Sequence, residues 1–87
     1  MEFKYIRTDL TFAIFSASET HSHIARAMTE KVTGAGFCDI DLMYYEEKGV
    51  EKAKIKVHCY GESISLGIKG DKKADENFIN QKINGEY

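Results

Sequence analysis

The stretch FCDIDLMYYEEKGVEKAKIKVHCY, residues 37–60, decides the fold. Apolar and polar residues alternate along both of its halves, which is typical of half-buried β-strands. Lys48 and Gly49 lie between the halves, where a two-residue hairpin turn requires a residue that accepts a positive φ. We therefore predict an antiparallel hairpin with strands at about 37–47 and 50–60.

The position of the turn also sets the register of this hairpin, because residue 47 must then lie opposite residue 50. The apolar cross-strand pairs are Leu42 with Ile55, Ile40 with Val57, and Cys38 with Cys59. The polar pairs on the other face are Asp41 with Lys56 and Asp39 with His58. We expect the two polar pairs to neutralise their charges across the strands.

A second turn is expected at Gly61-Glu62, followed by a third strand at about 63–69. In that register Leu66 and Ile68 meet the apolar face of the hairpin, and Lys69 lies opposite Lys54. The three strands together form a predicted antiparallel meander.

The N-terminal part combines extended and helical patterns. Residues 1–15 are rich in aromatic and β-branched residues and form either one long strand or two strands split near Thr8-Asp9. Residues 16–33 carry apolar residues at helical spacing, with Ser16 or Ser18 as the N-cap and Gly34 as the stop.

A second helix is predicted from Asp71, a good N-cap, to the glycine stop at Gly85. The order of elements is thus β(β)αβββα within a single domain, residues 1–87. The predicted class is α+β, a mostly antiparallel sheet with two helices packed on one face.

The composition limits the possible functions. The 87 residues have a formal net charge of −2, so a nucleic-acid contact would have to rest on a local patch. Two cysteines without a Cys-x-x-Cys spacing do not make a disulfide scaffold or a redox motif. The apolar runs are too short to span a membrane, and the N-terminus lacks the pattern of a signal peptide. We therefore expect a reduced, cytoplasmic protein.

The candidate binding residues are lysines on the outer face of the meander. Lys52, Lys54 and Lys69 have no carboxylate directly opposite them in the predicted register. Lys72 and Lys73 begin the last helix, where a phosphate could approach the exposed amides. Tyr45 and Met43 lie among these lysines. Such a cluster indicates either an anionic partner or a solvated edge kept positive against aggregation.

The segment AKIKVHCYGESISLGIKGDKKADENFINQKI, residues 53–83, resembles the ribosome hibernation-promoting factor family, as does the order βαβββα. The stretch GIKGDKKA is similar to the third-strand turn and Lys-Lys helix start of double-stranded RNA-binding domains. The resemblance implies contact with structured RNA, and it assigns that role to Lys72 and Lys73. It covers about half of the chain. The acidic Asp75 and Glu76, which follow these lysines in the same helix, depart from the family pattern.

No catalytic residues are predicted. His21 and His23 point to different sides of a helix, so they cannot easily share a metal ion. Cys38 and Cys59 face the predicted core, and His58 points to the opposite face from Cys59. No glycine-rich segment has the context of a phosphate loop. We expect no enzyme activity, no metal and no cofactor.

Two functions remain. The first is a protein that binds structured RNA or the ribosome through the lysine-lined corner, with an affinity that falls steeply as salt rises. The second is a protein-interaction module, a small inhibitor or adaptor, that docks by its exposed sheet face or edge strand and could form a homodimer through a sheet edge.

Overall fold

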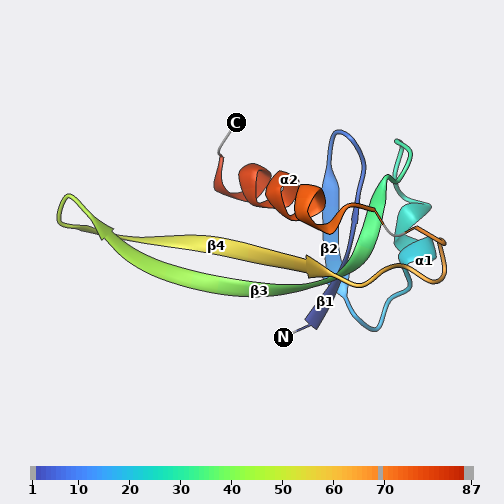
Figure 1. Cartoon of the computed structure of the whole chain (residues 1–87), viewed down its shortest axis with the longest axis horizontal. Coiled ribbons are helices and arrows are strands. Elements are labelled where there is room, and N and C mark those ends of the chain that lie inside the picture. The colour runs from blue at the N-terminus through green and yellow to red at the C-terminus, as the bar shows by residue number, and fades with distance from the viewer. Residues whose placement is uncertain (1, 69, 86–87) are drawn as a thin grey trace.

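The computed structural model describes residues 2–68 and 70–85. Its elements are β1 (Glu2–Arg7), β2 (Phe12–Ser16), α1 (His21–Ala25), β3 (Gly34–Glu47), β4 (Val50–Tyr60) and α2 (Lys72–Asn84). The four strands form one antiparallel sheet in the order β2-β1-β3-β4, shown with both helices in Figure 1. The predicted α+β class is confirmed.

The hairpin β3–β4 has the predicted register. Cys38 pairs with Cys59, Asp41 with Lys56, and Glu47 with Val50. Lys48 and Gly49 form the turn and both have a positive φ, 53° and 76°, as a type I′ turn requires. The alternation of apolar residues and the turn chemistry were therefore sufficient to predict this element.

The N-terminal residues form two strands, which resolves the choice between one long strand and two. The connection closes on Thr8, whose buried hydroxyl oxygen accepts the backbone N–H of Leu10 and of Thr11. β1 lies between β2 and β3, so that Tyr5 pairs with Ile14 on one side and with Gly36 on the other.

Helix α1 is shorter than predicted, since only His21–Ala25 is helical and Thr20 is its N-cap. Ser16 cannot cap a helix because it is the last residue of β2 and pairs with Phe3. The chain then returns to the sheet, where the backbone N–H of Thr33 donates to the carbonyl of Arg7 (2.9 Å). Despite the helical spacing of residues 26–33, this segment therefore leads back to the sheet instead of extending the helix.

The predicted third strand at 63–69 does not form in the described residues. Residues 63–68 fold back on themselves, with a single bridge from Ser63 to Ile68. The outer edge of β4 is instead occupied by side chains of α2. Glu76 accepts the N–H of Cys59 (2.9 Å), and Asn84 donates to the carbonyl of Ile55 (3.0 Å).

Helix α2 has the predicted limits, from the N-cap Asp71 to the left-handed Gly85. It covers one face of the sheet, where Ile79 packs against a core that includes Tyr5, Cys38 and Val57. Phe78 and Ile83 add partly buried contacts to this core.

Helix α1 contributes its buried side chain, His21, to the opposite face. The His21 ring makes edge-on contacts with Phe15 and Phe37, with ring centroids 5.6 and 5.8 Å away. Phe37 points away from Cys38 because neighbouring residues of a strand alternate between faces. The two helices therefore do not share one face of the sheet, which corrects that part of the prediction.

The hairpin β3–β4 extends well beyond the rest of the molecule, as Figure 1 shows, and the chain measures 46 × 26 × 21 Å. We call residues 41–56 the arm. In the register of the sheet, β1 pairs with β3 only as far as Asp39. The arm is consequently a two-stranded ribbon. No helix among the described residues is long and apolar enough to cross a membrane.

Candidate binding surfaces

The arm brings four of the predicted binding residues together. Met43 pairs with Lys54, and Tyr45 pairs with Lys52. All four side chains lie on the same face, because both residues of a directly opposed pair point to the same side of the ribbon. Met43 and Tyr45 are exposed.

The ion pairs on this face differ from those predicted. His58 contacts Asp41 (3.3 Å) and also Glu76 of α2 (3.7 Å), rather than Asp39. Lys52 lies 3.6 Å from Glu47, so it does have a carboxylate partner. Within residues 2–68 and 70–85, Lys56 has no carboxylate at ion-pair distance. Cross-strand position alone did not determine which charges meet, because long side chains also reach diagonal neighbours.

Two hollows adjoin the β4 side of the arm where α2 ends. One, of about 430 Å³, lies among Tyr45, Lys54 and Asn84, with Ala53 completing its lining. The other, of about 210 Å³, is lined by Met43, Ile55, Lys56, Lys54 and Asn80. The aromatic and lysine residues predicted for binding thus border concave surface.

Lys72, one of the residues predicted to contact RNA, does not extend outward from the start of α2 as expected. Its ammonium group points inward and donates to the carbonyl oxygen of Ala35 (2.5 Å) and to the hydroxyl of Tyr5 (3.1 Å). The exposed amides of the α2 N-terminus are also occupied, since the Asp71 carboxylate accepts the N–H groups of Lys73 and Ala74 (3.1 Å each). An incoming phosphate would have to displace this cap.

The predicted lysine corner is not assembled. Lys72 and Lys73 begin α2, whereas Lys54 lies near its end, beside Asn84. At 1.5 Å per residue, a helix of this length separates the two groups by about 18 Å. Lys73 is exposed, and Lys69 lies outside the described residues.

A buried polar network explains why Lys72 turns inward. Asp75 is 3% exposed, accepts a hydrogen bond from the Tyr5 hydroxyl (2.6 Å) and lies 3.5 Å from the Arg7 guanidinium. Burial, and then the bond to Asp75, raise the pKa of Tyr5 far above its ordinary value. The network also requires a glycine at position 34, because a Cβ atom there would lie 2.8 Å from the carboxyl carbon of Asp75. In the sequence alone, Asp75 stands out only as an acidic residue that departs from the family pattern.

The arm also has a second exposed apolar face, which was not predicted from the sequence. Leu42 and Ile55 were expected on the inner face of a meander, and Tyr44 lies on the same face of β3 as Leu42, but each of the three is between 39% and 68% exposed. The lengths of the helix and the strand could have indicated this exposure. A 13-residue helix covers about 20 Å, whereas an 11-residue strand spans about 36 Å, so the helix cannot cover the whole strand.

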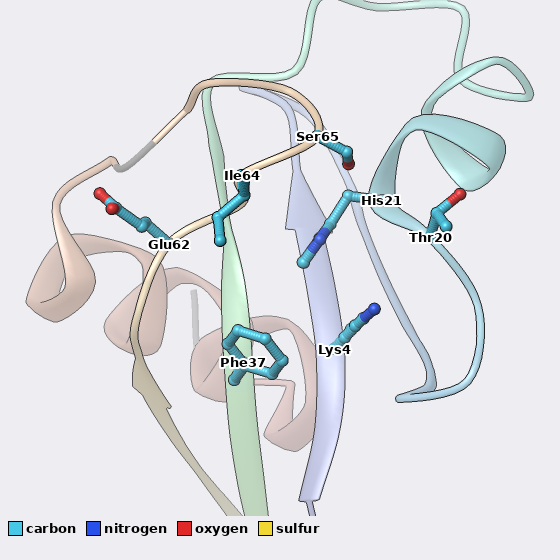
Figure 2. Close-up of a pocket in the computed structure, with 7 residues that line it drawn as sticks. All are labelled: Lys4, Thr20, His21, Phe37, Glu62, Ile64 and Ser65. Carbon is cyan, nitrogen blue, oxygen red and sulfur yellow. The ribbon is translucent and has the colours of Figure 1, made fainter.

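A third surface is a cavity of about 300 Å³ on the sheet face opposite α2 (Figure 2). Its lining comprises Lys4, Thr20, His21, Phe37, Glu62, Ile64 and Ser65. His21 is 3% exposed, and its Nε2 lies 2.7 Å from the carbonyl oxygen of Gly36. Burial and the nearby charges of Lys4 and Lys72 lower the pKa of His21. No sequence pattern marked these residues as a group.

No family model, curated protein or solved structure matches this chain. The resemblance to hibernation factors and double-stranded RNA-binding domains therefore stays a prediction. Among the described residues, no group of three or more His, Cys, Asp and Glu side chains is placed to hold a metal ion.

Proposed function

We propose that this chain is a protein-interaction module that docks a protein partner with its arm. The observation that carries the proposal is the exposure of apolar side chains on both faces of a two-stranded ribbon. They are Leu42, Met43, Tyr44, Tyr45, Val50 and Ile55. Isolated two-stranded ribbons are marginally stable in water, and clustered exposed apolar groups mark interaction sites.

The charges of the arm favour a protein over a nucleic acid. Residues 41–56 contain four carboxylates and four lysines, so the arm has no net charge. On the face of Met43 and Tyr45, Asp41 and Glu47 lie on β3, and the lysines lie on β4. A polyanion would meet repulsion along one strand, whereas a protein surface can present acidic groups to β4 and basic groups to β3.

The partner surface that fits this face has an apolar depression for Met43 and Tyr45, bordered by acidic side chains that approach Lys56. Aromatic and methionine anchors inside a charged rim are the usual composition of protein interfaces. Pairing along β4 from Ile55 to Cys59 is blocked by Glu76, Asn80 and Asn84. A partner strand would have to use another edge.

Binding of structured RNA or the ribosome is the competing function. Lys52, Lys54 and Lys56 lie in a row on one face of β4, next to Tyr45, and an aromatic ring among cations suits a nucleic-acid base. Two features favour docking of a protein over binding of RNA. Lys72 points inward, and the acidic residues of β3 would repel a polyanion.

The test is site-specific photocrosslinking in the protein's own cells, with p-benzoylphenylalanine in place of Tyr45. We expect a discrete protein adduct that forms equally after nuclease treatment and in 1 M salt. The same label at exposed Asn77 of α2 serves as the control and should not yield it. Met43→Ser with Lys56→Glu should abolish the adduct, and Lys73→Ala should not. An adduct lost on nuclease treatment would replace this proposal with RNA binding.

A further inference from the structure

The cavity beside His21 is independent of the arm and has the size of a small-ligand site. Its volume of about 300 Å³ is at the lower end of the range for ligand pockets. Figure 2 shows His21 and Ile64 on one side of the opening, with Phe37 and Lys4 across from them. Ile64 is 92% exposed, so an apolar ligand group at the rim would remove part of its side chain from water.

The positive charge of Lys4 is available to a ligand. Its ammonium group donates to the backbone carbonyl of Glu19 (2.7 Å), which leaves two of its three N–H donors. In the described part of the chain, Lys4 has no carboxylate at ion-pair distance. The Glu19 carboxylate pairs with His23 instead (3.0 Å), and Figure 2 shows the Glu62 carboxylate directed away from Lys4.

His21 adds an acceptor inside the cavity. A carbonyl oxygen can only accept, so the ring nitrogen Nε2 carries the proton that bonds to Gly36. The other ring nitrogen, Nδ1, has no hydrogen-bond partner among residues 2–68 and 70–85. Because no buried side-chain nitrogen or oxygen of the described residues lacks a partner, Nδ1 keeps some contact with solvent, and its ring lines the cavity.

The floor is aromatic. Phe37 stacks on Tyr60, with centroids 6.0 Å apart, and meets the His21 ring edge-on. The Lys4 ammonium lies 5.9 Å from the Phe37 ring centroid, so the cation is placed directly beside the apolar surface. A ligand that joins a hydrophobic group to a negative charge would satisfy both, whereas a cation would be repelled by Lys4.

We propose that this cavity binds a carboxylate that carries a hydrophobic group, with the carboxylate on Lys4 and the hydrophobic group between Phe37 and Ile64. Two sources supply this chemistry, a free aromatic or aliphatic acid and the C-terminus of a peptide with an apolar last residue. Site and occupant are separate from the arm and its partner, so either proposal can fail without the other.

The first experiment is an NMR titration of the ¹⁵N-labelled chain with phenylacetate. We expect saturable shifts at the amides of His21, Phe37 and Ile64, and a Kd of about 1–10 mM for a ligand of about ten non-hydrogen atoms. Phenethylamine has the same ring with the opposite charge, and acetate lacks the ring. Neither should saturate the cavity in this range.

Variants test the role of the charge. Lys4→Met should raise the Kd for phenylacetate at least 5-fold while its amide spectrum away from the cavity stays that of the wild type, and Lys4→Arg should keep the Kd within 2-fold. Lys73→Met removes the same charge from exposed α2 and should leave the Kd unchanged. Peptides ending in phenylalanine, as the acid and as the amide, distinguish the sources. Tighter binding of the peptide acid than of phenylacetate identifies a peptide C-terminus, and binding of phenylacetate alone identifies a free acid.

Three results would overturn the proposal. They are equal binding of phenethylamine and phenylacetate, unchanged binding in Lys4→Met, and the absence of shifts around the cavity at 20 mM phenylacetate.

Discussion

Asn80 of α2 holds both backbone hydrogen-bonding groups of Val57 on the sheet edge. Its side-chain oxygen accepts the Val57 N–H (2.7 Å), and its side-chain nitrogen donates to the Val57 carbonyl (2.9 Å). The amide thereby takes the place of a neighbouring strand. With Glu76 and Asn84 one turn to either side, α2 covers the part of β4 that would otherwise accept another strand.

Asn80→Ala should lower the free energy of unfolding by about 1–2 kcal/mol, because it removes two hydrogen bonds from a partly buried edge. Urea denaturation measures this change. Asn77→Ala, on the exposed side of the same helix, is the matched control and should stay within about 0.5 kcal/mol of the wild type. An Asn80 variant as stable as the Asn77 variant would mean that the edge contacts contribute nothing to stability.

Asp75→Asn should be more damaging, with a loss of about 3 kcal/mol. It leaves the partly buried charge of Arg7 without its carboxylate and takes the charged acceptor away from the Tyr5 hydroxyl. Tyr5→Phe removes the hydroxyl that donates to Asp75 and accepts from Lys72, and it should cost about 1–3 kcal/mol. Chemical denaturation of both variants measures these losses of stability. Glu51→Gln on the exposed arm is the control, and we expect the loss to be largest in Asp75→Asn. A loss in Asp75→Asn no larger than in Glu51→Gln would contradict it.

The stability of the fold should depend on pH through His21. Its pKa in the folded state is lowered from the ordinary value of 6.5, so the folded protein prefers the neutral ring. The resulting stabilisation is fully present above pH 6.5 and is lost as the pH falls through the folded-state pKa, because the unfolded chain binds the proton more readily. The groups that act on the ring are the carbonyl of Gly36, which opposes the shift, and the ammonium groups of Lys4 and Lys72.

Urea midpoints between pH 8 and pH 5 measure this dependence. In His21→Gln the slope should be shallower than in the wild type, whereas His23→Gln, which alters an exposed ring, should keep the wild-type slope. Identical slopes in wild type and His21→Gln would exclude His21 as the source.

The two thiols should react slowly in the folded protein. Burial is the main cause that raises the pKa of Cys38 to about 11 and that of Cys59 to about 12. At pH 8 the reactive thiolate of Cys59 is therefore roughly a thousand-fold rarer than in an ordinary thiol of pKa 9. Labelling with a disulfide reagent should be complete in urea and far slower without it. Equal rates in the two conditions would show that the β3–β4 core face is open.

The candidate site could be predicted only in part. Met43, Tyr45, Lys52 and Lys54 meet as the register required, because alternation and a turn suffice to define a hairpin face. The remaining lysines could not be placed from the sequence. Lys72 has the same exposed appearance as Lys73 in a helix start, yet it is drawn inward by Ala35 and Tyr5, which are more than 35 residues away in the chain.

The sequence by itself determined the local elements of this protein, namely the β3–β4 register and the limits of α2. Each depends on neighbouring residues, such as the Lys48-Gly49 turn, the Asp71 cap and the Gly85 stop. Only the tertiary structure decided which surfaces remained open. Side chains of α2 replaced the expected third strand on β4, and the length of the strands left the arm uncovered. These outcomes result from competition between distant segments for the same hydrogen-bonding groups and apolar surface, and local pattern contains no information about that competition.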